Sequence, residues 1–284
     1  MTRIDPTVHQ RELGERLRKL RSERGMTVED VAQSLLCSAA KISGLETGLR
    51  RQSLRDIRDL CSIYNADDST SVELMDLARG AREQTWWTQY EDLNLDPYLG
   101  QEQEATAITS FTTYYIPALL QTEDYTRVII GTIAPKMDPG IFEQRVEVRM
   151  RRQAILERDI RPRFSVFLDE AVLHRQVGNA ALMAAQLAKV LEAAHDGKAT
   201  IQVIRFDVGI PATVDSNFVL LEFGEDRDIS PIVFVEGLTV NQYLEREVDL
   251  NRYREAVGYL RDSAISPDAS IQYVADKRLR YLSR

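Results

Sequence analysis

Small hydroxyl and methyl side chains stand close to a cluster of basic side chains in residues 38–58. Serine hydroxyls and alanine methyl groups suit the base edges in the major groove of DNA, through hydrogen bonds and apolar contacts. The candidates for base contacts are Ser38, Ala39, Ala40 and Ser43. Lysine and arginine suit phosphates, which position a protein on DNA but carry no sequence information. The basic cluster consists of Lys41, Arg50, Arg51, Arg55 and Arg58, and the first three are the main candidates for phosphate contacts.

Two short helical patterns, back to back in residues 27–48, would position these side chains. Apolar residues recur at three- and four-residue intervals, which is the period of one helix face. They are Val28, Val31, Ala32, Leu35 and Leu36 in the first pattern, and Ile42 and Leu45 in the second. Ser38 is a natural N-cap for the second helix, and the small Ala32 allows two helices to cross closely. This spacing predicts a helix-turn-helix, whose second helix lies in the major groove with the candidates for base contacts facing outward.

Further helical patterns flank this motif. Leucines at positions 13, 17 and 20 form one stripe of a helix, and Gly25 is expected to end that helix. Thr27 and Asp30 approximate a capping box for the next helix, and Ser53 is the expected cap of a fourth helix. The inward residues of that fourth helix are Ile57, Leu60, Cys61 and Tyr64. Together with a fifth pattern in residues 66–84, the set resembles the Cro/CI-type repressor domain, and SAAKISGLETG is similar to that family's recognition helix and the turn after it. A small helical bundle without a DNA role is the alternative.

Two positions depart from the family pattern. Leu36 stands at the turn position that usually holds glycine, where a left-handed conformation would cost on the order of 1 kcal/mol. Gly44 stands at an outward position that often holds arginine or lysine. The departure at Leu36 concerns the geometry of the turn, whereas the departure at Gly44 indicates weak base readout, or specificity that rests on the loop arginines. Both departures are also the basis for an alternative hypothesis, an interaction protein that has lost DNA binding.

The net charge of -8 is unevenly distributed. Residues 1–64 contain twelve basic and nine acidic residues, whereas the remainder contains 24 basic and 35 acidic residues. Phosphate attraction depends on local arrangement rather than on total charge. A single arginine is explained equally well as a solvated surface charge, so the clustering near residues 41–58 carries the prediction. An acidic remainder would repel duplex DNA and leave one face able to bind it.

The remaining composition indicates a soluble protein. The chain shows no signal-peptide pattern and no run of about 18 apolar residues, so we expect a cytoplasmic protein that does not bind membranes. Cys37 and Cys61 have no partners at metal-ligand spacing, and they are expected to be small apolar residues in a reducing compartment. We expect no metal and no cofactor.

The sequence predicts an α+β protein in three parts. Residues 1–84 would form an all-α helix-turn-helix domain, residues 85–99 an aromatic connector, and residues 100–284 a mixed α/β domain with a small sheet flanked by helices. Trp86 and Trp87 are expected to pack at the junction, and stacking on bases is the less favoured alternative. Tyr90 and Tyr98 add aromatic anchors.

Within the second domain, a helix is expected over residues 102–113, followed by a break at Pro117. β-Rich runs predict strands at 163–168, 200–206, 217–223 and 232–235, and the last two, almost wholly apolar, should lie in the middle of the sheet. Helices are expected at 180–195, at 250–260 and after Ser266, with Thr122 capping another. Residues 141–158 predict one long helix whose arginines, interleaved with glutamates, form a solvated, ion-paired surface.

Catalysis is not favoured for this domain. The best acid–base candidates are Asp169 and Glu170 near His174, but a carboxylate after a strand more often caps the following helix. The chain has no phosphate-binding glycine loop. The turn around residues 114–120 could instead line a pocket for an effector or a partner, and its candidate residues are Tyr114, Tyr115, Pro117 and Leu120.

Taken as a whole, the chain resembles the actinobacterial WhiJ-type, antitoxin-like regulators. The resemblance rests on the order and spacing of six motifs: KISGLETG, LARGAREQTWW, IPALLQTEDY, RVEVRMRRQAIL, FLDEAVLHRQVG and VEGL. It implies a homodimeric transcriptional repressor that binds double-stranded DNA, is controlled through its second domain by a small partner protein encoded nearby, and acts in development. Ala118 replaces a common glycine, and His174 a common arginine. A repressor that responds to a small molecule is the alternative.

Overall fold

The computed structural model describes residues 7–50, 52–82, 86–87, 90, 96–209, 216–224, 227, 229–237 and 240–284. The chain divides into two compact units. The first comprises Met1–Glu104 and Gly224–Ile229, and the second comprises Ala105–Phe223 and Ser230–Arg284. Across the part of the chain that is described, every helix is too short or too polar to cross a membrane.

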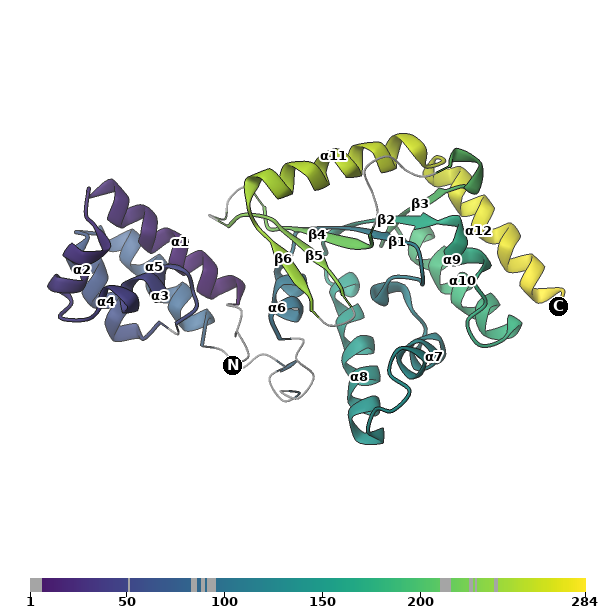
Figure 1. The fold of residues 1–284 in the computed structure, drawn as a ribbon, viewed down its shortest axis with the longest axis horizontal. Helices are drawn as coiled ribbons and strands as arrows, with labels where there is room; N and C mark the ends of the chain where they lie inside the picture. Colours follow the sequence, from purple (N-terminus) through teal and green to yellow (C-terminus); the bar gives the residue numbers. More distant parts are fainter. Residues whose placement is uncertain are drawn as a thin grey trace. The chain divides into compact units, whose positions relative to one another are not determined.

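The first unit is all-α (Figure 1). Its helices are α1 (Val8–Glu23), α2 (Val28–Ser34), α3 (Ala39–Glu46), α4 (Leu54–Ile63), α5 (Asp68–Gly80) and α6 (Asp96–Glu104). Most begin at a side chain that accepts a hydrogen bond from the backbone N–H three residues on, as N-caps do. The capping box predicted for Thr27 and Asp30 is confirmed, and so are the caps at Ser38 and Ser53. Gly25, with a φ of 65°, follows the end of α1 as expected.

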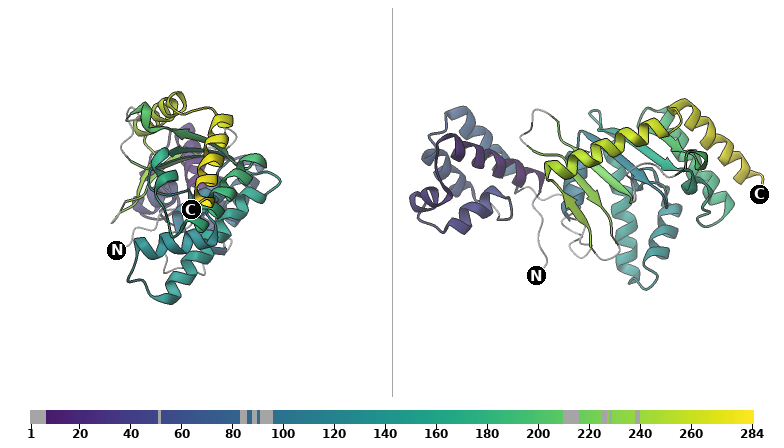
Figure 2. Two further views of the ribbon diagram at one scale, coloured as in Figure 1. Left: turned by 90° about the vertical axis from the view of Figure 1, so that its right-hand side faces the viewer. Right: turned by 45° about the horizontal axis from the view of Figure 1, so that its top comes forward.

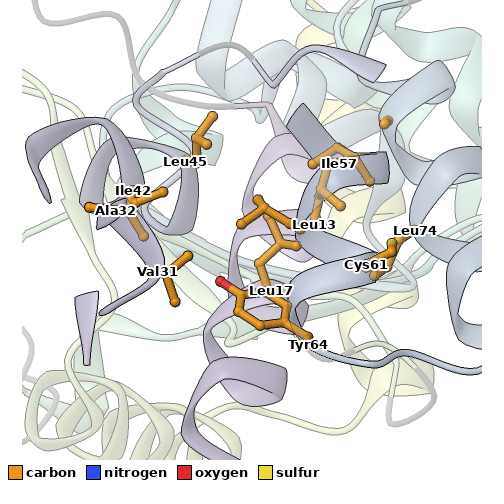
Figure 3. Close-up of a cluster of buried hydrophobic side chains, with 12 residues drawn as sticks. Leu13, Leu17, Val31, Ala32, Ile42, Leu45, Ile57, Cys61, Tyr64 and Leu74 are labelled. Atoms are coloured by element: carbon orange, nitrogen blue, oxygen red, sulfur yellow. The ribbon is translucent and has the colours of Figure 1, made fainter. Parts of the chain in front are cut away.

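A single apolar cluster holds α1 to α5 together (Figure 3). It includes every residue predicted to face inward on α4 and the predicted pair on α3, Ile42 and Leu45, which are each 1% exposed. Burying one such side chain contributes about 1.5–3 kcal/mol. α1 crosses the end of α3 so closely that a Cβ at Gly14 would lie 2.4 Å from the Glu46 carbonyl oxygen. Both cysteines are free, with Cys61 buried and Cys37 partly exposed.

The second unit contains a six-stranded mixed sheet with the strand order β3-β2-β1-β4-β5-β6. β1 pairs in parallel with β2, as β2 does with β3, and the other neighbours are antiparallel. The strands are β1 (Ala107–Thr112), β2 (Arg163–Asp169), β3 (Thr200–Ile204), β4 (Phe218–Glu222), β5 (Ile232–Val235) and β6 (Gln242–Leu244). The predicted α+β class is confirmed, as is the interior position of β4 and β5.

Helices cover both faces of this sheet (Figure 1 and Figure 2). α11 lies on one face, where Leu250, Val257 and Leu260 pack against Phe111 and Phe167, and α8 and α10 lie on the opposite side. The helices are α7 (Glu123–Ile133), α8 (Pro139–Arg152), α9 (Glu170–His174), α10 (Ala180–His195), α11 (Glu247–Ser263) and α12 (Pro267–Leu282), with 3₁₀ turns η2 (Ala118–Leu120), η3 (Gln153–Glu157) and η4 (Phe206–Val208). The predicted caps at Thr122 and Ser266 are confirmed.

Two sequence predictions for the second unit are wrong, and one strand was not predicted. Residues 107–112 form the central strand β1 instead of a helix, because the run AITSFT is buried along its whole length and pairs with β2 and β4 on either side. Such tertiary pairing overrides local helical preference. The short strand β6 was not predicted. The helix expected over residues 141–158 ends as an α-helix at Arg152 and continues as the 3₁₀ turn η3.

Candidate nucleic-acid interface

The turn between α2 and α3 sets the direction in which α3 leaves the unit. Leu36 adopts a left-handed conformation with a φ of 53°, and the backbone N–H of Cys37 donates to the Ala32 carbonyl at 2.9 Å. For a residue with a Cβ, this conformation costs about 1–2 kcal/mol. The Leu36 side chain is 92% exposed, so burial does not offset the strain. Leu36 therefore adopts the left-handed conformation that glycine usually provides at this position.

The exposed face of α3 presents the smallest side chains of the motif. Ser38, Ala40 and Ser43 are exposed, whereas Ala39 is half-buried against the apolar cluster. The Ser38 hydroxyl also accepts from the backbone N–H of Lys41 at 3.2 Å and so caps the helix. Three of the four candidates for base contacts therefore share an accessible surface that offers two hydroxyls and one methyl group.

Lys41 is engaged inside the unit. Its Nζ lies 2.6 Å from Asp56 Oδ1, and the two side chains are only 22% and 18% exposed. Burial raises the pKa of Asp56, but hydrogen bonds from Lys41 and Ser53 and the charge of Lys41 outweigh it and lower that pKa. The pair joins α3 to α4. Lys41 thus has a structural partner that no local sequence pattern indicates.

Arg50 lies against the glycine of the recognition helix. Its backbone N–H donates to the Gly44 carbonyl at 2.9 Å, and a Cβ at Gly44 would lie 3.1 Å from Arg50 Cβ. The Arg50 side chain is exposed. A loop arginine therefore lies beside the helix position that lacks a basic side chain. Arg55 is 89% exposed and 3.9 Å from Asp59, and Arg51 lies outside the described residues.

Two contacts that sequence reasoning missed hold the end of α3. Arg21 donates two hydrogen bonds to the Glu46 carboxylate, at 2.6 and 2.9 Å. The Gln52 amide donates to the Leu45 carbonyl at 3.0 Å and to the Gln10 carbonyl at 3.1 Å. Both contacts join residues from different helices or loops, and no local sequence signal marks them. They fix the loop that carries Arg50 relative to the helix that it accompanies.

The candidates in the second unit do not share one surface. Tyr114 is 57% exposed, with the Arg175 guanidinium 5.6 Å from its ring centroid. Tyr115 is half-buried and donates to Glu236 at 3.1 Å. Pro117 and Leu120 are buried. Only the two tyrosines are accessible to a ligand or partner.

The acid–base candidates of the second unit have structural roles. Asp169 accepts from the backbone N–H of Ala171 at 2.8 Å, so the helix-cap interpretation is confirmed. Glu170 instead contacts His174 and two residues of α12. The described residues contain no group of three or more histidine, cysteine or acidic side chains arranged to hold a metal ion. In the first unit, Trp86 and Trp87 pack edge to face at 5.5 Å, with Trp87 buried.

Comparison with known proteins matches two families to separate parts of the chain. Residues 12–74 match the family described as Helix-turn-helix domain, and residues 95–276 match the family described as Domain of unknown function (DUF5753). A search of curated proteins finds no match. The helix-turn-helix domain indicates a DNA-binding regulator rather than an enzyme. The second match covers more than half of the chain's 284 residues. The chain therefore belongs to the DUF5753 family.

Proposed function

We propose that this protein is a cytoplasmic, homodimeric repressor of the WhiJ-type, antitoxin-like kind, which reads DNA with α3 and is controlled by a small partner protein through its second unit. The observation that carries DNA recognition is the exposed face of α3, with Ser38, Ala40 and Ser43 accessible and Arg50 lying beside Gly44. Small side chains on a recognition helix permit its backbone to approach the base edges closely. The hydroxyls and the methyl group then supply the contacts.

In this proposal, Arg50 provides from the loop the charge that position 44 lacks. It contacts phosphate and orients the helix, while Ser43 contributes to sequence preference. Arg55, on the exposed side of α4, is a second phosphate ligand. Lys41 supports the interface indirectly, because its ion pair with Asp56 holds α3 against α4. Loss of DNA binding is less favoured, because Leu36 forms the turn and Gly44 accommodates the arginine loop.

Control by a partner protein and homodimer formation rest on the family resemblance. A dimer would place two copies of α3 on half-sites about one helical turn apart. Co-expression with the protein encoded next to this chain, followed by size-exclusion chromatography, tests both points. A stable complex that changes DNA affinity supports partner control, and a monomer that binds one half-site contradicts the dimer.

Fluorescence anisotropy on DNA from the region upstream of the coding sequence tests recognition, with scrambled DNA for comparison. Arg50→Ala is expected to weaken binding to both DNAs and to reduce the slope of log affinity against log salt by about 0.9. Ser43→Ala is expected to cost about 0.5–1.5 kcal/mol on the specific DNA alone, as loss of a single hydrogen bond does. Arg79→Ala is the matched control, because Arg79 is an exposed arginine of α5, outside α3 and the loop that follows it. Equal losses for Arg50→Ala and Arg79→Ala would refute the proposed interface.

A further inference from the structure

One face of α8 carries three arginines. Arg145, Arg149 and Arg152 are spaced by four and three residues, so they lie on the same side of the helix. Arg152 is only 9% exposed, and the other two are half-buried. This arginine stripe packs beside the turn of residues 115–121, where Arg149 donates to the buried Gln121 side chain at 3.3 Å. The sequence prediction of a solvated, ion-paired surface is therefore wrong for this side of α8.

Two arginines of the stripe, Arg145 and Arg149, lack a carboxylate partner among the described residues. Arg145 Nε is buried there without a hydrogen-bond partner. Burial and the neighbouring Arg152 and Arg145 lower the pKa of Arg149 to about 10, against the opposing effects of Tyr115 and Glu236. Burying a guanidinium is costly unless an anion pairs with it. Such a cost without a partner is characteristic of a functional site.

The acidic side chain whose charge acts on Arg149 is Glu236, which follows β5. Its carboxylate accepts from the Tyr115 hydroxyl at 3.1 Å, and its charge acts on both Tyr115 and Arg149. Glu236 is exposed, so it partly neutralises the arginine stripe from the solvent side. The Tyr115 hydroxyl donates its one proton to Glu236, so an incoming anion would compete with Glu236 for this hydrogen bond and would be repelled by its charge. Removing the charge of Glu236 should therefore favour anion binding.

The turn of residues 115–121, beside the arginine stripe, is held by side-chain hydrogen bonds. The Gln153 amide donates to the carbonyls of Ala118 and Gln121 at 2.9 and 2.8 Å, and Lys189 Nζ donates to the Gln121 carbonyl at 2.9 Å and to Gln153 Oε1 at 2.5 Å. These side chains come from η3 and α10, and they satisfy the carbonyls of the turn. The turn is thus fixed before any ligand binds, and Arg149 is tied to it through its hydrogen bond to Gln121, which lowers the entropic cost of binding.

We propose that the arginine stripe of α8, with the Tyr115 hydroxyl, binds the phosphoryl group of a small molecule. Arginine forks bind phosphate oxygens in pairs, and a phosphoryl dianion matches the two guanidinium groups that lack a carboxylate partner. Half-burial of the arginines suits a terminal group on a small ligand. All of these residues lie in the second unit, so the site stands independently of the proposed DNA binding.

Thermal unfolding in inorganic phosphate tests this site, with sodium chloride at equal ionic strength as reference. Binding to the folded state raises the melting temperature. Far-UV circular dichroism follows both units, whereas tryptophan fluorescence reports on the first unit, which contains Trp86 and Trp87. We expect phosphate to raise the melting temperature of the second unit, which circular dichroism follows and tryptophan fluorescence does not. Stabilisation equal to that by chloride, or confined to the fluorescence transition, would overturn the proposal.

Variants locate the site. Arg149→Gln and Arg145→Gln are each expected to weaken phosphate binding by about tenfold or more, as loss of a charge-assisted contact does. Glu236→Gln, on an exposed side chain, is expected to strengthen binding several-fold, which a merely unfolded variant cannot imitate. Arg151→Gln is the matched control, because Arg151 is exposed on another side of the same helix. Equal weakening by Arg149→Gln and Arg151→Gln would refute the assignment.

Two further ligands distinguish the chemical source of the anion. Acetate at equal ionic strength tests a carboxylate in place of phosphate, and a short scrambled DNA duplex tests whether the phosphate belongs to nucleic acid. We expect both to stabilise the second unit less than inorganic phosphate does. Stronger stabilisation by acetate would overturn the phosphoryl assignment, and displacement of phosphate by the duplex would overturn the small-molecule assignment.

Discussion

The carboxylate of Glu170 joins three elements of the second unit, and its removal is a sensitive test of the fold. It accepts from the Tyr273 hydroxyl and from the backbone N–H of Phe206 at 2.9 Å, and it lies 2.9 Å from His174 Nε2 and 3.6 Å from Lys277 Nζ. The side chain is 10% exposed. Burial raises the pKa of Glu170, but the hydrogen bonds from Tyr273, Phe206 and His174 and the charge of Lys277 outweigh it and lower that pKa to about 2.

The magnitude follows from the fall in pKa from 4.5 to about 2. It corresponds to on the order of 3 kcal/mol of stability from the ionised group. Because the folded-state pKa is the lower one, this contribution is fully present above the unfolded-state pKa and is lost as the pH falls through about 2. Glu170→Gln should therefore be less stable than the natural protein by about 3 kcal/mol at pH 6. The difference should shrink steadily between pH 4.5 and about 2.

Urea unfolding followed by far-UV circular dichroism measures this difference. Tryptophan fluorescence in the same samples should show little change, because both tryptophans belong to the first unit. Glu255→Gln serves as the control, since Glu255 is exposed on α11. A deficit for Glu170→Gln below about 1 kcal/mol at pH 6, the net value of an ordinary hydrogen bond, would refute the reasoning. So would a deficit that does not change with pH.

Two predictions concern the first unit, and both are measured by urea unfolding followed by tryptophan fluorescence. Leu36→Gly should raise the free energy of unfolding by about 1 kcal/mol relative to Leu36→Ala, because alanine retains the cost of the left-handed backbone; equal stabilities would show that the turn is unstrained. Lys41→Ala should lower it by about 1–3 kcal/mol, because Asp56 loses its partner in a site where it is 18% exposed. The double variant Lys41→Ala, Asp56→Ala should lose less than the two single losses together, and strict additivity would contradict a coupling between α3 and α4.

The helix-turn-helix was predictable because its signals are local. Caps at Thr27, Ser38 and Ser53 act on backbone groups three residues away, and the apolar spacing of α2 and α3 selects one inward face. The family pattern identified Leu36 as a turn position that usually holds glycine, and the structure shows the left-handed conformation there. The partner of Lys41 could not be predicted in this way, because Asp56 is fifteen residues away, on the helix that follows α3.

The second unit depends on contacts that no local pattern specifies. β1 is central because β2 and β4 pair with it from positions more than 50 residues later. Its own residues, read alone, do not distinguish a buried strand from a buried helix. The contact between Glu170 and Tyr273 joins residues 103 positions apart. The sequence identified Glu170 as a candidate for acid–base chemistry. Its contacts with Tyr273 and Lys277 of α12 show that it holds the fold together.

The arginine stripe of α8 lies between these cases, because a helical projection of the sequence would have found it. At about 100° per residue, Arg145, Arg149 and Arg152 fall within roughly 60° of one another. Glu143, Glu147 and Arg151 project to the other side, and in the structure these three are exposed. Alternating signs along a sequence therefore do not imply paired charges in space. Sorted by helix face, the same residues form one exposed side and one cationic side that packs against the protein, and the cationic side is the one for which we propose an anion.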